Sequence, residues 1–198
     1  RAKEPSSLWG CGIIIAKPVL EGRRAESAGL AAAKNVREGK EMPIQLRRCQ
    51  RGDLEELSAL FYHAVHEACR RDYTSRQLDA WAPDKRALLG REDLVQEQYA
   101  LAAVADGRVV GYGTLDRRGY LDHLFVHPEF QRQGVASALC RQLEERAWAQ
   151  GNEAVEVHAS ITALPFFIGR GYQVEQEQQV PLRGEILTNY RMKKGRQP

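Results

Sequence analysis

Residues 120–139 read YLDHLFVHPEFQRQGVASAL, and this stretch decides the fold. Its first part is rich in aromatic and β-branched residues in partial alternation, which is typical of a β-strand. Pro128 ends the strand because proline has no amide hydrogen for the sheet ladder. From Val135 onward apolar residues recur at helical spacing, so a helix is predicted to begin there.

The junction between this strand and this helix is predicted to bind an anion. The first amides of a helix have no partner inside the helix, and the helix dipole favours negative charge at that end. Gly134 and Ala136 are small, so the oxygens of an anion can approach the backbone closely. A glycine before a helix is weak evidence by itself, because many such turns need only its conformation.

Two sequence blocks together carry more information than the single glycine. The pattern Gln-x-x-Gly-x-Ala at residues 131–136 resembles the acetyl-CoA signature of the GCN5-related N-acetyltransferases. Residues 159–172, ASITALPFFIGRGY, resemble the later block of that family, in which a polar residue ends a strand and a short helix follows. The resemblance covers roughly residues 42–193 and is closest to a subfamily with the ASIT-A-PFF block.

Composition restricts the function further. The 198 residues suffice for one domain with a sizeable core, and 43% hydrophobic with 28% charged residues is ordinary for a soluble globular protein. A net charge of +3, with arginines spread along the chain, does not indicate a nucleic-acid partner. The four cysteines share no close spacing, which favours free thiols in a reducing cytoplasm over a zinc site or disulfides.

The first 41 residues differ from the remainder. Their apolar run, residues 8–16, is too short to span a bilayer, and Glu4 argues against a secretory signal. Met42 looks like a natural domain start. We therefore expect residues 1–41 to be a mostly disordered upstream extension, residues 42–198 to be the N-acetyltransferase domain, and no membrane partner.

The order of predicted elements defines an α/β fold. The resemblance implies a mixed, mainly antiparallel twisted sheet of six to seven strands with helices on both faces. Helices are expected after Asp53, where that residue caps the first turn, and over residues 72–83, with Thr74 or Ser75 as cap. The predicted strands are 44–49, 99–105, 108–115, 120–126, 154–159, 173–180 and 186–193, and a further helix is expected over 162–170.

The resemblance also implies how acetyl-CoA is bound. The pantetheine arm is expected to pair like a short strand with Leu124, Phe125 and Val126, and Ser160 stands where many relatives carry an asparagine that contacts the cofactor. Backbone amides of the 131–136 loop are expected to bind the pyrophosphate. That loop comprises Gln131, Arg132, Gln133, Gly134, Val135 and Ala136.

The acceptor amine must lose a proton before it can attack, because an alkyl amine with a pKa of about 10 is mostly protonated at neutral pH. Strand alternation places Tyr120 and Asp122 on the same face as Leu124 and Val126. In an apolar cleft the pKa of Asp122 would rise, and its carboxylate could accept the proton directly or through water. The alternative for Asp122 is a turn cap or an arginine partner; the histidines nearby rank lower.

Other residues are predicted to have supporting roles. In the resembled family a tyrosine usually protonates the departing thiolate, but Phe167 occupies its place, and Tyr120 is the substitute. Tyr73 and Trp81 are candidate walls of the substrate pocket, with plain packing as the alternative. The two histidines on the first helix, His63 and His66, favour a solvated or cleft-lining face over a metal site, and no metal site is predicted.

The predicted function is transfer of an acetyl group from acetyl-CoA directly to an amine in a ternary complex. A small molecule or antibiotic is favoured over a protein as acceptor, and a homodimer is compatible with the resembled family. One alternative is a catalytically weak acyl-CoA-binding or regulatory module, which Phe167 favours. Another is transfer to a hydroxyl group, or transfer of a different acyl group to an amine.

Overall fold

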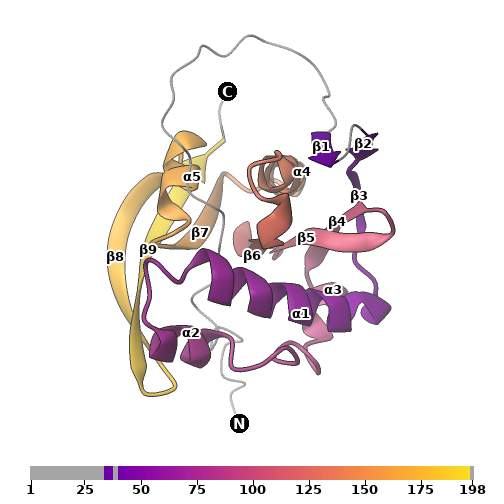
Figure 1. The fold of residues 1–198 in the computed structure, drawn as a ribbon. Helices are drawn as coiled ribbons and strands as arrows, with labels where there is room; N and C mark the ends of the chain where they lie inside the picture. Colours follow the sequence, from indigo (N-terminus) through magenta and orange to yellow (C-terminus); the bar gives the residue numbers. More distant parts are fainter. Residues whose placement is uncertain (1–33, 38–39, 197–198) are drawn as a thin grey trace.

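A seven-stranded sheet forms the centre of the computed structural model, which describes residues 34–37 and 40–196 (Figure 1). The strand order is β3-β4-β5-β6-β7-β9-β8, and every neighbouring pair is antiparallel except β6 and β7. This confirms the predicted fold class. The strands are β3 (Gln45–Arg48), β4 (Tyr99–Ala105), β5 (Arg108–Leu115), β6 (Tyr120–Val126), β7 (Ala154–Ser160), β8 (Gln173–Leu182) and β9 (Glu185–Gly195).

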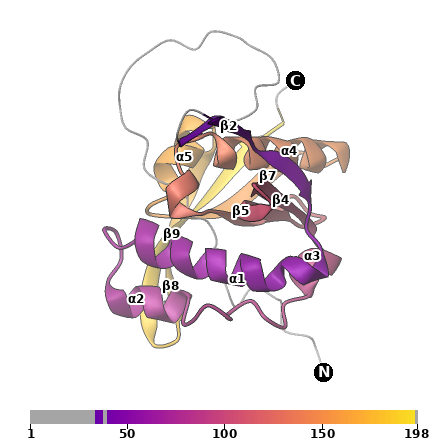
Figure 2. The ribbon, with the colours of Figure 1, turned by 45° about the vertical axis from the view of Figure 1, so that its right-hand side comes forward.

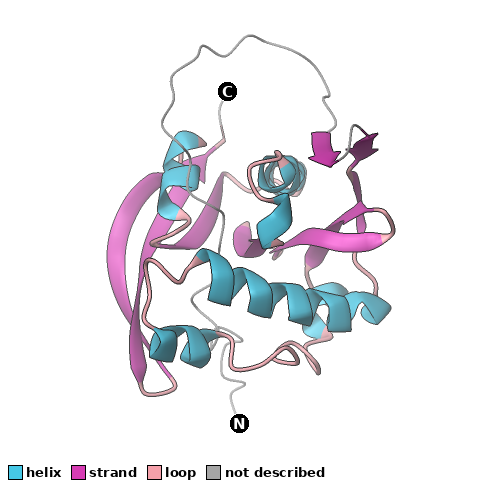
Figure 3. Cartoon of the chain, in the orientation of Figure 1, coloured by secondary structure: helices cyan, strands magenta, loops and turns pink. Residues whose placement is uncertain are grey.

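Helices cover both faces of the sheet (Figures 2 and 3). Helix α4 packs with α5 on one face, and α1 packs with α2 on the other. The helices are α1 (Leu54–His63), α2 (Ser75–Trp81), α3 (Asp93–Gln96), α4 (Val135–Ala149) and α5 (Leu164–Gly169). Shorter turns are η1 (Arg51–Asp53), the π-helical η2 (Ala64–Ala68) that continues α1, and η3 (Pro128–Phe130).

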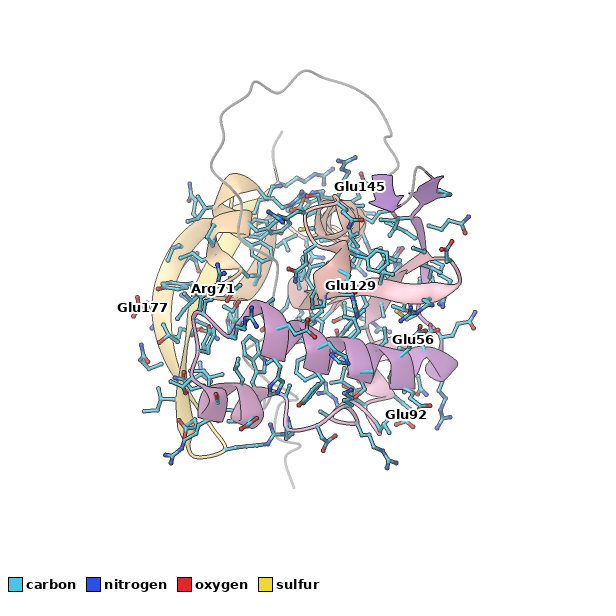
Figure 4. All side chains as sticks on the ribbon, in the orientation of Figure 1. Glu56, Arg71, Glu92, Glu129, Glu145 and Glu177 are labelled. Atoms are coloured by element: carbon cyan, nitrogen blue, oxygen red, sulfur yellow. The ribbon has the colours of Figure 1, made fainter. Side chains whose placement is uncertain are left out.

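Each face of the sheet has its own apolar core, and side chains fill both layers (Figure 4). Under α4, buried residues of the helix stripe contact alternate residues of the strands. The α4 contribution is Val135, Ala136, Leu139, Cys140, Leu143 and Ala147. Under α1, Leu57, Leu60 and Phe61 pack with Tyr112 and Phe125 of the central strands.

The helix caps agree only in part with the sequence. Thr74 caps α2 as predicted, since its hydroxyl accepts the Gln77 amide at 3.3 Å. Asp53 lies directly before α1, but its carboxylate does not cap that helix, so this prediction was wrong. Instead it accepts two hydrogen bonds from Arg47, at 2.7 and 2.8 Å, and the Gln50 amide at 2.7 Å. The bidentate guanidinium is the stronger partner, and it lowers the pKa of Asp53.

The expected upstream extension is outside the described residues for the most part. Its described pieces include strand β1 (Lys34–Arg37), which pairs antiparallel with β2 (Lys40–Pro43) as a separate two-stranded ladder. Its proposed disorder therefore stays a prediction.

A buried carboxylate ties three elements together on the α4 face. Glu144 of α4 accepts hydrogen bonds from Arg170, after α5, at 2.7 Å and from Lys194 of β9 at 3.1 Å. Burial opposes ionisation of this carboxyl, but the two cations outweigh it and hold the pKa of Glu144 below its usual value. Removing the anion would leave two largely buried cations without their partner.

Replacing Glu144 with glutamine should lower the free energy of unfolding by about 3–5 kcal/mol at pH 7, the usual cost of breaking a buried pair. Urea titrations measure this, with Glu145→Gln as the control because Glu145 is exposed on the same helix (Figure 4). The depressed pKa makes this stabilisation fully present above the ordinary value of 4.5, and it is lost as pH falls through the folded value. Equal losses in the two variants would contradict the prediction.

Candidate active site

The junction between β6 and α4 has the backbone that the sequence predicted. Strand β6 ends at Val126, and the chain passes through η3 into a turn with left-handed residues at Arg132 (φ 59°) and Gly134 (φ 81°). Glycine adopts this conformation without steric cost, whereas Arg132 does not. Non-glycine residues held in this region are typical of ligand-binding loops. Helix α4 begins directly afterwards at Val135.

Hydrogen bonds hold the shape of the loop. One of them uses a predicted ligand group, because the backbone amide of Gln131 donates to the Pro128 carbonyl at 3.4 Å. The side-chain amide of Gln133 donates to the Glu129 carbonyl at 2.9 Å, and the side-chain amide of Gln131 donates to the Val126 carbonyl at 3.4 Å. The first-turn amides of α4 have no acceptor inside the helix, and its dipole is positive at this end. Val135 and Ala136 are buried, so their side chains face the core. Such an end can bind a phosphate group through its backbone.

The strands β6 and β7 part beside this helix end. Their parallel ladder consists of two residue pairs, Tyr120 with Glu156 and Leu121 with Val157. By contrast, β5 follows β6 up to Val126, and β9 follows β7 up to Ser160. Beyond Leu121, therefore, the facing edges of β6 and β7 have no ladder partner among the described strands.

The free edge of β6 presents alternate peptide groups. The His127 amide donates to the Val110 carbonyl of β5 at 2.9 Å, and adjacent residues turn their peptide groups to opposite edges. Leu124 and Val126 therefore direct their N–H and C=O groups away from β5, toward the side where β7 diverges. Phe125 pairs with Tyr112 of β5 instead, and its ring lies in the α1 core. An extended ligand that contains amide groups could pair with Leu124 and Val126.

A β-bulge changes which side chains face the site. Thr114 pairs with His123, but the next residue of β5 pairs with Leu121, so Asp122 is an extra residue in β6. The Asp122 carboxylate accepts the Gln98 amide at 3.1 Å and lies 3.8 Å from His123 Nε2, on the α1 side of the sheet. Leu124 and Val126 pack under α4. The predicted common face for these residues and Asp122 was therefore wrong, because the bulge interrupts the alternation.

The α1 side contains a buried polar pair that the sequence did not indicate. The Tyr112 hydroxyl lies 3.1 Å from His123 Nδ1, and both residues are buried. Burial raises the pKa of Tyr112 well above its usual value and lowers the pKa of His123. A proton on Nε2 of the neutral imidazole lets the hydroxyl donate to Nδ1 and turns an N–H toward Asp122. His123 and Asp122 lie on the same face of the sheet because of the bulge. Strand alternation alone cannot predict a bulge.

A second histidine lies where the two strands part. His158 of β7 contacts the ring of Tyr120 with centroids 5.2 Å apart, and its Nε2 lies 3.6 Å from a Glu156 oxygen. Burial lowers the pKa of His158, and Arg191 on β9 adds to this, whereas Glu156 and Asp122 oppose it. No local sequence pattern marks His158, because its contacts depend on the pairing of β6 with β7.

Ser160 and the two predicted aromatic walls are buried. The Ser160 hydroxyl accepts the Ala163 amide at 3.1 Å and so shapes the turn after β7. Tyr73 and Trp81 meet with ring centroids 5.5 Å apart, at 6% and 2% exposure. The Tyr73 hydroxyl donates to the Thr188 carbonyl and accepts the Ile161 amide, which joins separate elements. These contacts favour the packing alternative for both rings.

Phe167 is fully buried in the α4 core, where its ring packs against Tyr172 with centroids 4.9 Å apart. It has no group that could donate a proton.

On α1, His63 pairs with Glu67 at 3.2 Å, and the neighbouring η2 residue His66 reaches the Ala82 carbonyl at 2.9 Å. Within residues 34–37 and 40–196, no group of three or more histidine, cysteine or acidic side chains is arranged to hold a metal ion. Nor is any helix in these ranges long and apolar enough to cross a membrane.

Comparisons with known proteins agree with this geometry. A family model described as an acetyltransferase (GNAT) domain matches residues 69–194. The uncharacterized N-acetyltransferase YafP of Escherichia coli K12 is 37% identical over 150 residues, which cover 76% of this chain and 95% of YafP. Among solved structures, a GCN5-related N-acetyltransferase from Rhodopseudomonas palustris superposes with a TM-score of 0.73 at 29% identity, covering 85% of this chain and 99% of that one.

The fold is shared with more distant proteins as well. The PaiA N-acetyltransferase of Thermoplasma acidophilum, solved with coenzyme A, gives a TM-score of 0.63 at 19% identity over 78% of this chain and 100% of its own. Fold and site together define an acyltransferase. The chain belongs to the GNAT acetyltransferase family.

Replacing Tyr112 with phenylalanine should lower the free energy of unfolding by about 1–3 kcal/mol, because His123 Nδ1 loses its partner in a buried place. Nitrogen chemical shifts of the His123 ring should also show a changed tautomer balance. Tyr62→Phe is the control, since the ring of Tyr62 keeps its stacking on His66 at 4.2 Å without the hydroxyl. Equal stability and unchanged ring shifts in Tyr112→Phe would contradict the hydrogen bond.

Proposed function

We propose that the chain transfers the acetyl group of acetyl-CoA directly to an amine in a ternary complex. The observation that carries this proposal is the parting of β6 and β7 beside the N-terminus of α4. The N-terminus of α4 suits a diphosphate, and the free edge of β6 suits a chain of amide groups. The family of the chain supports the same cosubstrate, since relatives were solved with coenzyme A or acetyl-CoA.

Each part of the cosubstrate has a proposed partner. The backbone amides of residues 132–136 bind the diphosphate, since that of Gln131 donates to Pro128, and the exposed Arg132 side chain adds positive charge. The pantetheine arm pairs with Leu124 and Val126 through their outward peptide groups, beside Phe125. Ser160 is the last residue of β7, the strand on the other side of this opening. An amide of the same β6 edge donates to the thioester oxygen as negative charge develops on it.

The acceptor is proposed to approach on the face opposite α4. Asp122 accepts a proton from the ammonium group, directly or through water, and Tyr120 is the candidate from sequence for donating a proton to the thiolate. The carboxylates of Asp122 and Glu156 favour a cationic amine there. A small-molecule amine or antibiotic therefore suits the site better than a protein, and the buried Tyr73 and Trp81 would support the acceptor side from beneath.

The setting of the reaction belongs to the same proposal. The described cysteines, Cys49, Cys69 and Cys140, are buried and form no disulfide, which suits the proposed reducing cytoplasm. Strand β8 is an edge strand with Val174 exposed at 47%, which supports a homodimer through that edge.

A second candidate function is an acyl-CoA-binding or regulatory module with weak catalysis. Phe167 favours it, because the residue is fully buried and cannot donate a proton. Steady-state assays separate the two functions. An enzyme releases free coenzyme A only when an amine from a panel is present, whereas a binding module retains acetyl-CoA without acceptor-dependent release.

Replacing Gly134 with alanine should weaken coenzyme A binding by about tenfold or more, because a side chain at this positive φ strains the loop and shifts the binding amides. Gly151→Ala is the matched control: it lies past the other end of α4 at φ 84°, with nothing near its Cβ position. Both variants should lose about 1–2 kcal/mol of stability from the left-handed alanine. Calorimetric titration with coenzyme A should find weakened binding in Gly134→Ala alone; equal affinities would refute the proposed diphosphate site.

Replacing Asp122 with asparagine should lower turnover of acetyl-CoA and amine by about 10²-fold or more, because the proton acceptor is lost. Coenzyme A affinity should stay the same. Glu97→Gln is the control, since Glu97 is an exposed carboxylate beside Gln98. Unchanged kinetics in Asp122→Asn would remove Asp122 as the base.

A further inference from the structure

The point where β6 and β7 part brings two side chains from different strands to one place. The last paired residues on the face opposite α4 are Tyr120 and Glu156. On β7 the next residue on that face is His158, because Val155, Val157 and Ala159 point into the α4 core. On β6 the bulge turns Asp122 to the same face. His158 and Asp122 therefore flank the opening of the two strands from opposite sides.

The surroundings of His158 fit it for proton transfer. Its side chain is 24% exposed, and the edge-to-face contact with Tyr120 fixes the ring plane. Glu156, with an oxygen 3.6 Å from Nε2, favours a proton on that nitrogen and leaves the lone pair on Nδ1. The other charged neighbours are Asp122 on β6 and Arg191 on β9, which pairs with Glu175 of β8 at 3.3 Å. The lowered pKa of His158 keeps the ring neutral at pH 7.

The chemistry of amide formation requires two proton movements. The ammonium group first loses one proton to become a nucleophile, and that proton goes to Asp122 and then to solvent. As the new C–N bond forms and the C–S bond breaks, the nitrogen must lose a second proton and the thiolate must gain one. Phe167 cannot supply that proton, and Tyr120 has a pKa near 10 in its ordinary state.

We propose that His158 is a catalytic residue of the transfer, which takes the second proton from the attacking nitrogen at Nδ1 and returns it to the thiolate of coenzyme A. This inference rests on the proposed acetyl transfer. An imidazolium with a pKa near 6.5 protonates a thiolate, whose thiol has a pKa near 8.5, in the favourable direction. One residue then serves as base and acid in succession, so no separate tyrosine is required.

The test compares His158→Gln with the wild type in steady-state assays with acetyl-CoA. The acceptor probes are an alkylamine, an alkyl diamine and an Nα-blocked lysine amide. His158→Gln should lower kcat by about 10²-fold or more with an unchanged coenzyme A affinity, and added imidazole should restore part of the rate. In the wild type, kcat should fall at low pH as the His158 ring becomes protonated. This fall should be absent in His158→Gln. His63→Asn is the control, because His63 lies on α1 and pairs with Glu67.

The outcomes separate this inference from the function on which it rests. A wild type that releases no coenzyme A with any probe overturns the proposed acetyl transfer and this inference with it. An active wild type with His158→Gln within about twofold of its rate overturns the role of His158 alone. If Tyr120→Phe loses as much activity as His158→Gln, and imidazole does not rescue His158→Gln, the role of His158 is overturned. The Tyr120 hydroxyl would then be the proton donor to the thiolate. Thermal unfolding of each variant checks that the fold is retained.

Discussion

The short parallel ladder between β6 and β7 is the constraint on which the remaining structure depends. Two residue pairs join these strands, in a sheet whose other neighbours pair antiparallel along most of their length. A parallel pair needs a crossover, and α4 provides it over the core face. The crossover necessarily begins at the carboxyl end of β6, so the positive end of α4 lies beside the place where the strands separate. Fold topology thus brings the proposed anion site and the outward peptide groups of β6 together.

The bulge at Asp122 decides on which face of the sheet the carboxylate lies. Strict alternation with Leu124 and Val126 would point Asp122 under α4 into an apolar core, where an unpaired carboxylate is costly. With the bulge, the carboxylate meets Gln98 and His123 on the opposite face. The α4 side can then remain a dry support for the loop, while polar groups gather on the side where an acceptor can approach.

Sequence patterns predicted the elements well because helix and strand periods are local. The strands 99–105 and 108–115 were predicted with the observed bounds, because alternation is a local signal. The face of Asp122 was mispredicted, since a bulge depends on the register of β5. His158 and Tyr112 went unnoticed for a related reason: each gains significance only from a residue on a neighbouring strand. Long-range pairing was the missing information.

The substitution at Phe167 bears most directly on how such a site works. A tyrosine there would bring a hydroxyl into the α4 core, where the Phe167 ring packs fully buried against Tyr172. A phenylalanine adds no further polar group to this layer, and the proton donor that we propose lies on the other face. There the proposed proton-transfer groups are His158, Asp122 and Tyr120; the ring of His158 contacts that of Tyr120, and Asp122 raises the pKa of His158 against the effect of burial. Because these groups come from both parting strands, the separation proposed to admit the thioester would also set the distance between the groups proposed to exchange protons with it.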